Sequence, residues 1–199
     1  MELGTWIAIS LVSLLLSGLF SGTEMAYVTA DRVRTELDVK RGGPLSRIIN
    51  RFYSNSELFI STILVGNNIV LVIYGMGAAA LLEPPLRSIF NNEAIVLTCQ
   101  TLASTAVILL IGEFLPKTVF GINPNSSLKI IALPIYLFYI ILYPISLFTV
   151  GLSRLLMRMV GIRNSDKKLR LISIGDLNDY LEETIDDLQD QKEEVENEV

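Results

Sequence analysis

The sequence contains no histidine and a single cysteine, Cys99, among its 199 residues. Without histidine, the chain cannot use imidazole for acid–base catalysis, for a serine triad or for binding a metal. Without a second cysteine it has no disulfide framework, and the usual ligands of zinc and copper are missing. A metal site in this chain must therefore use oxygen ligands, which suit magnesium, calcium, manganese or an alkali ion.

Aspartate is absent from the first thirty residues, since none precedes Asp31. An intramembrane protease needs an aspartate pair, a serine–histidine arrangement or a zinc site, and the sequence offers none of these within its apolar segments. We therefore predict that the chain is not an enzyme.

Charged residues are also missing from several long stretches, and 51% of the sequence is hydrophobic. These stretches approach or exceed the roughly 20 apolar residues that cross a bilayer. We therefore predict an all-α membrane protein with three transmembrane helices, over residues 3–30, 58–82 and 94–114. Glu83-Pro84-Pro85 is predicted to end the second of these spans.

Basic residues gather in two segments, with six in residues 31–57 and six in residues 154–170. The positive-inside rule puts both segments in the cytoplasm. Three spans of the cell membrane then place the N-terminus outside the cell and the C-terminus in the cytoplasm. A fourth full span through the apolar residues 130–153 would move the second basic segment outside.

Prolines inside that fourth apolar region, Pro134 and Pro144, favour a re-entrant or interfacial helical pair over residues 128–160. Four full spans with one misplaced basic segment is the competing interpretation. Residues 31–55 alternate basic and apolar side chains around Gly42-Gly43-Pro44, which predicts two amphipathic helices on the membrane surface, with a plain loop as the alternative.

The C-terminal residues 176–199 carry eleven of the 21 acidic side chains and one lysine. Their leucines and isoleucine recur at helical spacing, which predicts an acidic amphipathic helix. We therefore divide the chain into a transmembrane domain, residues 1–172, and an acidic cytosolic helical linker, residues 173–199, truncated before a further cytosolic module. The basic residues flank apolar spans without interleaved aromatics, so no nucleic-acid partner is expected.

Polar residues interrupt the apolar segments at four places. They are Ser17, Ser21 and Glu24; Gly66, Asn67 and Asn68; Gln100, Thr101, Ser104 and Thr105; and Gly112, Glu113, Pro116 and Lys117. Each group also has a structural interpretation: small residues allow close helix packing, and asparagines bond neighbouring helices. Similarly, Glu24 could reach the headgroups, and Glu113 could pair with Lys117 four residues later.

Taken together, these residues predict one site. The first and third spans run in the same direction, so Ser21 and Glu113 lie at comparable depth, and the asparagines approach that level from the other side. Pro116 lacks an N–H and frees a backbone carbonyl near Glu113. Hydroxyl, amide, carbonyl and carboxylate oxygens at one depth form an all-oxygen cation site suited to magnesium or sodium.

The same residues resemble the transmembrane domain of the cyclin M / CorC family of magnesium transport proteins. The resemblance rests on Ser17-x3-Ser21-Gly22-x-Glu24-Met25-Ala26, Gly66-Asn67-Asn68 and Gly112-Glu113-x2-Pro116-Lys117, in this order. Met25 stands where the family pattern has a small residue. The acidic helix is similar to the family's linker to a cytosolic CBS-pair module that binds ATP with magnesium.

The resemblance implies a homodimer in the bilayer, with three spans and juxtamembrane helices in each subunit. It also implies a dehydrated Mg²⁺ held by Ser21, Asn68, the Gly112 carbonyl and Glu113, with Ser17 and Asn67 as further ligands. Glu24 and Lys117 would shape the charge of the cavity, and Pro116 would break the helix.

We therefore predict a membrane magnesium transporter that exports Mg²⁺, with Na⁺ as the coupling ion. The alternative is a membrane-embedded magnesium sensor or scaffold, which would signal to a cytosolic partner without net flux.

Overall fold

The computed structural model describes residues 3–31, 34–35, 37 and 43–160, and these residues form helices and short connections with no strand among them. This confirms the predicted all-α membrane protein. The predicted acidic linker, the end of the transmembrane domain from residue 161, and most of the first predicted surface helix lie outside the described residues. The chain divides into two units, 1–151 and 152–199, and the description below concerns the first.

Helices account for nearly all of the described chain. They are α1 (Leu3–Thr29), α3 (Pro44–Ser54), α4 (Ser56–Ile89), α5 (Glu93–Val107), the π-helix η1 (Ile108–Phe114), α6 (Leu115–Ile122) and α7 (Pro124–Met159). Four helical runs in the described residues are long and apolar enough to cross a membrane: α1, α4, the continuous run Glu93–Ile122, and α7. That is one more than the three predicted spans.

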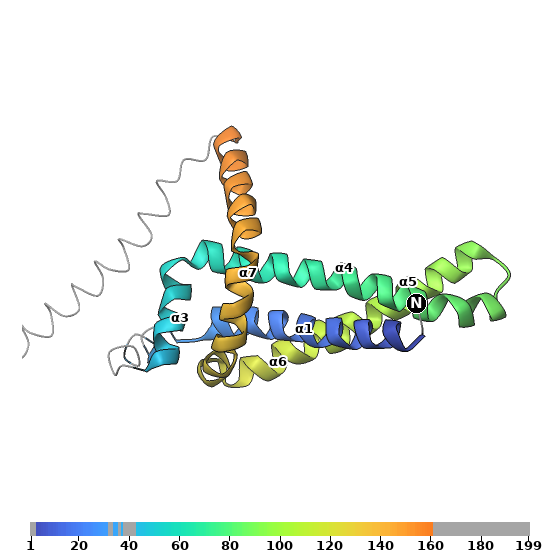
Figure 1. Cartoon of the computed structure of the whole chain (residues 1–199), viewed down its shortest axis with the longest axis horizontal. Helices are drawn as coiled ribbons and strands as arrows, with labels where there is room; N and C mark the ends of the chain where they lie inside the picture. The colour runs from blue at the N-terminus through green and yellow to red at the C-terminus, as the bar shows by residue number, and fades with distance from the viewer. Residues whose placement is uncertain (1–2, 32–33, 36, 38–42, 161–199) are drawn as a thin grey trace, which may run out of the picture. The chain divides into compact units, whose positions relative to one another are not determined.

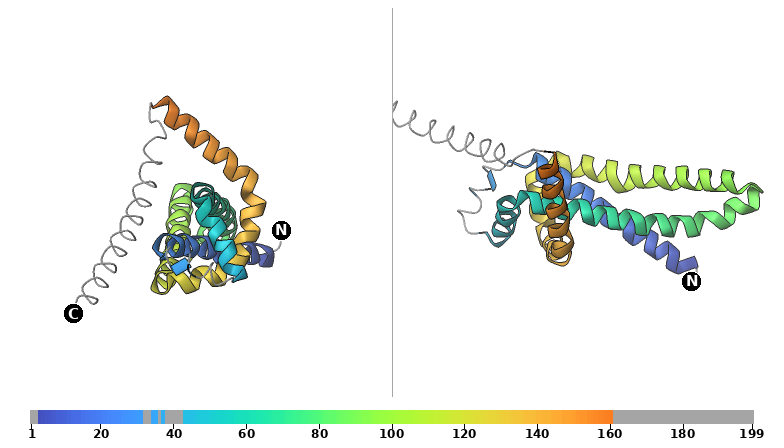
Figure 2. Two further views of the ribbon diagram at one scale, coloured as in Figure 1. Left: turned by 90° about the vertical axis from the view of Figure 1, so that its left-hand side faces the viewer. Right: turned by 90° about the horizontal axis from the view of Figure 1, so that it is seen from above.

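The difference lies in α7, which is one 36-residue helix rather than the predicted helical pair, with Pro134 and Pro144 inside it. Proline removes a single hydrogen bond and kinks a helix, but it need not end one. Up to Gly151, α7 runs across α1 and α4 rather than alongside them (Figures 1 and 2). This crossing favours the predicted interfacial placement of α7, and the number of spans stays a prediction.

The second long helix, α4, also continues beyond its predicted end. The chain stays helical through Pro84 and Pro85 to Ile89. Arg87 Nε lies 2.8 Å from Glu83 Oε1, one turn earlier, and Arg87 Nη2 lies 3.2 Å from Glu93 Oε1. These ion pairs span the prolines and the turn into α5, so the charges support a helical end that the prolines alone would weaken.

The direction of α4 is opposite to that of α1. The Ser17 hydroxyl of α1 donates to Asn67 of α4, whereas Tyr27, near the end of α1, donates to Ser56 at the start of α4. Residue numbers thus rise along α1 as they fall along α4. Two antiparallel spans joined through a surface helix match the predicted alternation of the first two spans.

In contrast, α6 runs parallel to α1. A Cβ atom added at Gly18 would lie 3.1 Å from Pro116 Cγ, and one added at Gly22 would lie 2.8 Å from the ring of Phe120. Glycines one turn apart on α1 therefore let α6 approach closely. This is the relative direction expected for the first and third spans.

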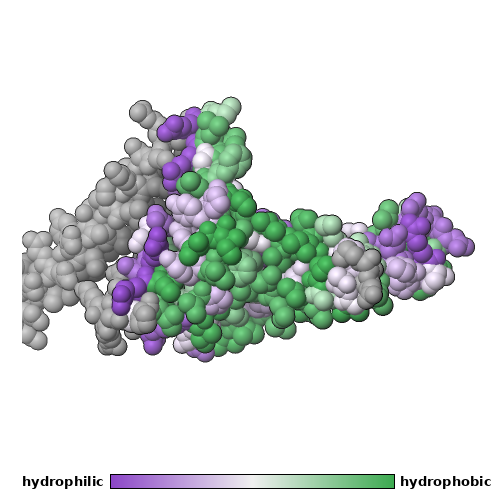
Figure 3. Space-filling view, in the orientation of Figure 1, coloured by the Kyte–Doolittle hydropathy of each residue, from purple (hydrophilic) through white to green (hydrophobic). Residues whose placement is uncertain are grey.

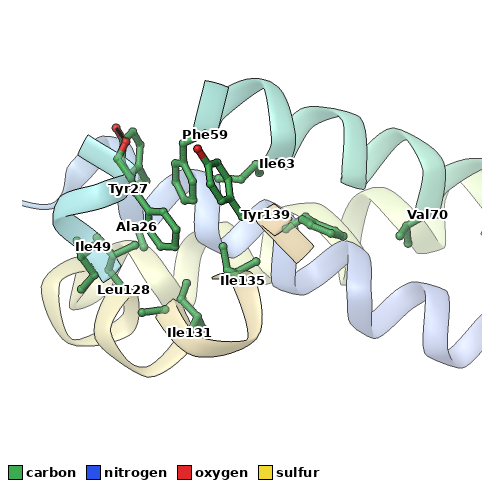
Figure 4. Close-up of a cluster of buried hydrophobic side chains, with 13 residues drawn as sticks. Ala26, Tyr27, Ile49, Phe59, Ile63, Val70, Leu128, Ile131, Ile135 and Tyr139 are labelled. Atoms are coloured by element: carbon green, nitrogen blue, oxygen red, sulfur yellow. Dashed lines mark hydrogen bonds between the residues drawn. The ribbon is translucent and has the colours of Figure 1, made fainter. Parts of the chain in front are cut away.

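The main core lies where α1, α3, α4 and the first half of α7 meet (Figure 4). Phe52 and Phe59 are fully buried and stacked, with ring centroids 4.1 Å apart, and Tyr139 of α7 lies 5.8 Å from Phe52. Tyr27 packs against Phe59 with ring centroids 4.7 Å apart. The amphipathic α3 therefore buries its apolar face here, as predicted for a helix on the membrane surface.

Apolar side chains cover the middle of the long helices, and hydrophilic ones gather at the α4–α5 turn and near α3 (Figure 3). Many large apolar side chains along this middle part are exposed, such as Leu15, Val72 and Leu102. A soluble monomer rarely exposes so large a contiguous apolar surface, whereas a bilayer solvates it. The exposed apolar surface therefore indicates a domain that lies within a membrane.

Candidate cation site

One face of α1 carries serines that are buried inside the helix assembly. Ser13, Ser17 and Ser21 follow each other at intervals of four residues and are 4%, 0% and 1% exposed. The face is buried because α1 lies between α4 on one side and η1 with α6 on the other. Sequence reasoning singled out Ser17 and Ser21 but missed Ser13, although its spacing was the available signal.

Asn67 of α4 meets this serine face directly. The Ser17 hydroxyl donates to Asn67 Oδ1 over 3.0 Å. The neighbouring Gly66 allows the close approach, because a Cβ atom there would lie 2.6 Å from the ring of Phe20. Within the Gly66-Asn67-Asn68 motif, Asn67 is thus the residue that the structure brings to the serines, whereas Asn68 lies exposed on α4.

The backbone of η1 reaches the serine face from the opposite side, at Gly112. A Cβ atom at Gly112 would lie 3.2 Å from Ser17 Oγ and 2.6 Å from Ile108 Cδ1. The Gly112 carbonyl oxygen lies 4.0 Å from the Cβ position of Gly18. Because Gly112 has no side chain, the η1 backbone can approach α1 closely. Its carbonyl oxygen therefore lies close to α1.

Among the described residues, the Ser21 hydroxyl has no hydrogen-bond partner, although Ser21 is only 1% exposed. Several other helical hydroxyls bond the carbonyl one turn earlier: Thr23 donates to Leu19 O over 2.6 Å, and Thr62 donates to Leu58 O over 2.8 Å. Leaving a buried hydroxyl unpaired costs stability, so each case calls for an explanation. A ligand that binds at Ser21 would supply the missing partner.

The third predicted span passes through a π-helix at the site. The Leu115 N–H bonds Leu110 O, five residues earlier, and α6 then begins with Pro116 in its first turn. Pro116 was predicted to break the helix, but the structure shows a change of helical register with the chain still helical. Because proline has no N–H, it still withholds one bond from the carbonyls of the preceding turn. Single π turns frequently mark functional sites.

Three charged residues lie beside this turn. Lys117 Nζ is 3.1 Å from Glu24 Oε2 of α1, so the structural alternative of a Glu113–Lys117 salt bridge is wrong. Glu113 is partly buried and makes no ion pair or hydrogen bond with the described residues. Its carboxylate is therefore the one that stays available to a cation at this turn.

The weaker polar stripe on α5 is not brought to the serines. Thr101 and Thr105 are exposed, and the Ser104 carbonyl accepts a bond from the Tyr74 hydroxyl over 3.3 Å. Gln100 Oε1 is buried without a hydrogen-bond partner among the described residues. These contacts link α4 to α5, and they do not extend the Ser17–Asn67 cluster.

The oxygen atoms of this cluster are of the kinds that would suit a hard cation. Over the described ranges, no three His, Cys, Asp or Glu side chains gather closely enough to hold a metal. A cation here would therefore depend on neutral oxygens together with the Glu113 carboxylate. Hydroxyl, amide, carbonyl and carboxylate oxygens are the ligands that Mg²⁺ takes.

A family model described as the cyclin M transmembrane N-terminal domain matches residues 8–194. The chain belongs to this cyclin M domain family. The motifs that carried the resemblance thus lie within a match that covers nearly the whole chain.

Several relatives share the cyclin M domain with this chain. UPF0053 inner membrane protein YfjD of Escherichia coli (strain K12) is 26% identical over 148 residues, or 74% of this chain and 33% of that protein. The UPF0053 protein MG146 homolog of Mycoplasma pneumoniae is 30% identical over 153 residues, or 72% of this chain and 35% of that protein. A chloroplastic DUF21 domain-containing protein of Arabidopsis thaliana is 28% identical over 182 residues, or 87% of this chain and 26% of that protein. The chain spans about a third or less of the length of these relatives.

Proposed function

We propose that this membrane domain transports Mg²⁺ through a site between α1, α4 and η1. The proposed ligands are the side chains of Ser17, Ser21, Asn67 and Glu113 and the Gly112 carbonyl. Asn68, which was predicted as a ligand before Asn67, has the weaker support because its side chain is exposed on α4. The proposal assigns the domain no enzymatic role.

The observation that carries the proposal is the meeting of three helices at Ser17. Its hydroxyl bonds Asn67 of α4 at 3.0 Å, and the Gly112 backbone of η1 is close enough that a Cβ atom would lie 3.2 Å away. The unpartnered Ser21 hydroxyl lies one turn further along the same face. Hydroxyl and amide oxygens therefore meet here beside the Gly112 backbone, and the next residue, Glu113, makes no ion pair within the described part of the chain. Polar groups inside a membrane domain are costly unless they bind an ion or bond to one another.

Direction, coupling and assembly belong to the same proposal. The domain exports Mg²⁺ across the cell membrane, sodium entry drives export, and the helices rearrange around the site to give alternating access. The N-terminus faces outside and the C-terminus faces the cytoplasm, as the basic segments indicate. The proposed assembly is a homodimer, and a cytosolic CBS-pair module is its further proposed partner.

The test is Mg²⁺ flux from vesicles that contain the purified chain. Glu113→Gln should abolish flux, and Asn67→Ala should reduce it more than Asn68→Ala does, because only Asn67 contacts Ser17. The matched control is Glu93→Gln, since the Glu93 side chain is 74% exposed at the start of α5.

Equal flux by wild type and Glu113→Gln would contradict the proposal. Saturable Mg²⁺ binding that depends on Glu113 but gives no flux would instead support the alternative function, a magnesium sensor or scaffold. A larger loss with Asn68→Ala than with Asn67→Ala would keep the site but restore the ligand order first predicted from the sequence.

A further inference from the structure

The Glu24–Lys117 ion pair uses a lysine that lies only four residues after Glu113. Lys117 Nζ is 3.1 Å from Glu24 Oε2, and both side chains are partly exposed, at 41% and 34% for lysine and glutamate. Glu113 makes no ion pair within the described part of the chain. The Lys117 ammonium group is thus paired with Glu24, which is close in space, and it is also close in sequence to Glu113.

Lys117 is also able to reach Glu113. The two residues are four positions apart, with glutamate first, which is the favoured order for an ion pair along a helix. The run from η1 into α6 is continuously helical, so about one helical turn separates them. Glu24 and Glu113 are therefore competing partners for the same lysine.

The packing of α6 on α1 determines that Lys117 pairs with Glu24 and not with Glu113. Pro116 and Phe120, on either side of Lys117, lie against Gly18 and Gly22, with added Cβ atoms at 3.1 and 2.8 Å. Such close backbone approach leaves little freedom to slide one helix along the other. Glu24 is therefore held opposite Lys117.

We propose that Glu24 is a positioning residue: it holds the Lys117 ammonium away from Glu113 and thereby sets the affinity of the site for its cation. When Glu24 is lost, Lys117 turns to Glu113 and occupies the carboxylate as a tethered substitute cation. The inference rests on the proposed function, because it requires that Glu113 bind the cation.

The two ends of one ion pair should then give opposite results. Glu24→Gln releases Lys117 onto Glu113 and weakens Mg²⁺ binding, by about two- to fivefold for a partly exposed pair. Lys117→Met removes the competing cation, and Mg²⁺ binding becomes tighter. A purely structural ion pair would shift binding in the same direction whichever partner is removed.

The double variant separates positioning from simple local charge. If Glu24 acts only through Lys117, Glu24→Gln/Lys117→Met binds Mg²⁺ like Lys117→Met, because Glu24 has nothing left to hold. If the two charges act independently on the cation, their effects multiply and the double variant returns towards wild type.

The experiment is a Mg²⁺ titration of the purified, full-length chain and its variants in lipid nanodiscs, with thermal unfolding measured in parallel. Opposite single effects with a double variant like Lys117→Met support the proposal, and multiplicative or same-sign effects overturn it. If Lys117→Met fails to fold, Glu24→Asp and Lys117→Arg test the same point. Glu24→Asp shortens the carboxylate side chain and should weaken Mg²⁺ binding, whereas Lys117→Arg retains the positive charge and should bind Mg²⁺ nearly as wild type does. If Glu113→Gln binds Mg²⁺ like wild type, both the proposed site and the role of Glu24 are wrong. If Glu113→Gln weakens Mg²⁺ binding but the Glu24 and Lys117 variants do not behave as predicted, only the role of Glu24 is wrong.

Discussion

The aromatic core and the serine face of α1 use the same helix in opposite ways. In the core, Phe52, Phe59 and Tyr27 fill space with large rings, and the Tyr27 hydroxyl donates to Ser56 over 2.8 Å. On the serine face, small residues bring backbones together, and the Ser21 hydroxyl has no hydrogen-bond partner within the described part of the chain. The Tyr27 hydroxyl in the first region is paired internally, whereas the second region keeps oxygen atoms available for a ligand.

This contrast indicates that the aromatic core serves stability and that the serine face serves function. Filling space and pairing every polar group stabilises the fold. A buried unpaired hydroxyl and an unpaired carboxylate do the opposite, and proteins tolerate such groups mainly at functional sites. Substitutions in the two regions should therefore separate stability from ion binding.

The largest expected effect on stability comes from the aromatic core. Phe59→Ala removes a fully buried ring that stacks on Phe52 and should lower the free energy of unfolding by about 3 kcal/mol or more. Phe148→Ala is the control, because Phe148 is 71% exposed on α7. Denaturant unfolding in mild detergent measures both variants, and similar losses for the two would contradict the assignment of the core.

An intermediate effect is expected at Gly112, where the two properties meet. Gly112→Ala puts a methyl group 3.2 Å from Ser17 Oγ and 2.6 Å from the flexible end of Ile108. We expect a cost of about 1 kcal/mol in stability, at the low end for overpacking, and a clear loss of Mg²⁺ affinity because the η1 backbone moves away from α1. Gly75→Ala is the matched control, since nothing lies within 4 Å of its added Cβ atom. Unchanged Mg²⁺ affinity in Gly112→Ala would argue that this backbone approach serves packing alone.

The smallest expected change in stability has the opposite sign. Ser21→Ala removes a buried hydroxyl that bonds none of the described residues, so stability should stay the same or rise by about 1 kcal/mol. Mg²⁺ binding should fall in the same variant. Thr23→Val is the control: its hydroxyl bonds Leu19 O, so the loss should slightly destabilise without affecting the ion. A clearly destabilised Ser21→Ala that still binds Mg²⁺ would remove the distinction between the two regions.

The sequence predicted the elements that follow from local composition. The apolar runs located α1, α4 and the third span, and the polar interruptions located Ser17, Ser21, Gly112 and Glu113. These features could be recognised because charged and polar groups are costly in hydrocarbon and therefore conspicuous in a membrane segment. The parallel and antiparallel directions of the helices followed from counting spans.

Other features depend on how helices rotate and cross, which composition does not encode. Asn67 and Asn68 are adjacent in sequence, and only the rotation of α4 decides which of them faces Ser17. The partner of Lys117 was ambiguous because Glu113 has the right helical spacing, whereas Glu24 is brought close only by the packing of α6 on α1. The single, crossing α7 and the π-helical turn likewise depend on tertiary contacts.

The most direct test of the central claim is a high-resolution experimental structure determined with Mg²⁺ present. We predict a Mg²⁺ ion between α1, α4 and η1. Its oxygen ligands, at about 2.1 Å from the ion, should include those of Ser17, Ser21, Gly112 and Glu113. An ion bound elsewhere, or density that leaves the Ser21 hydroxyl and the Glu113 carboxylate without contact to it, would contradict the account.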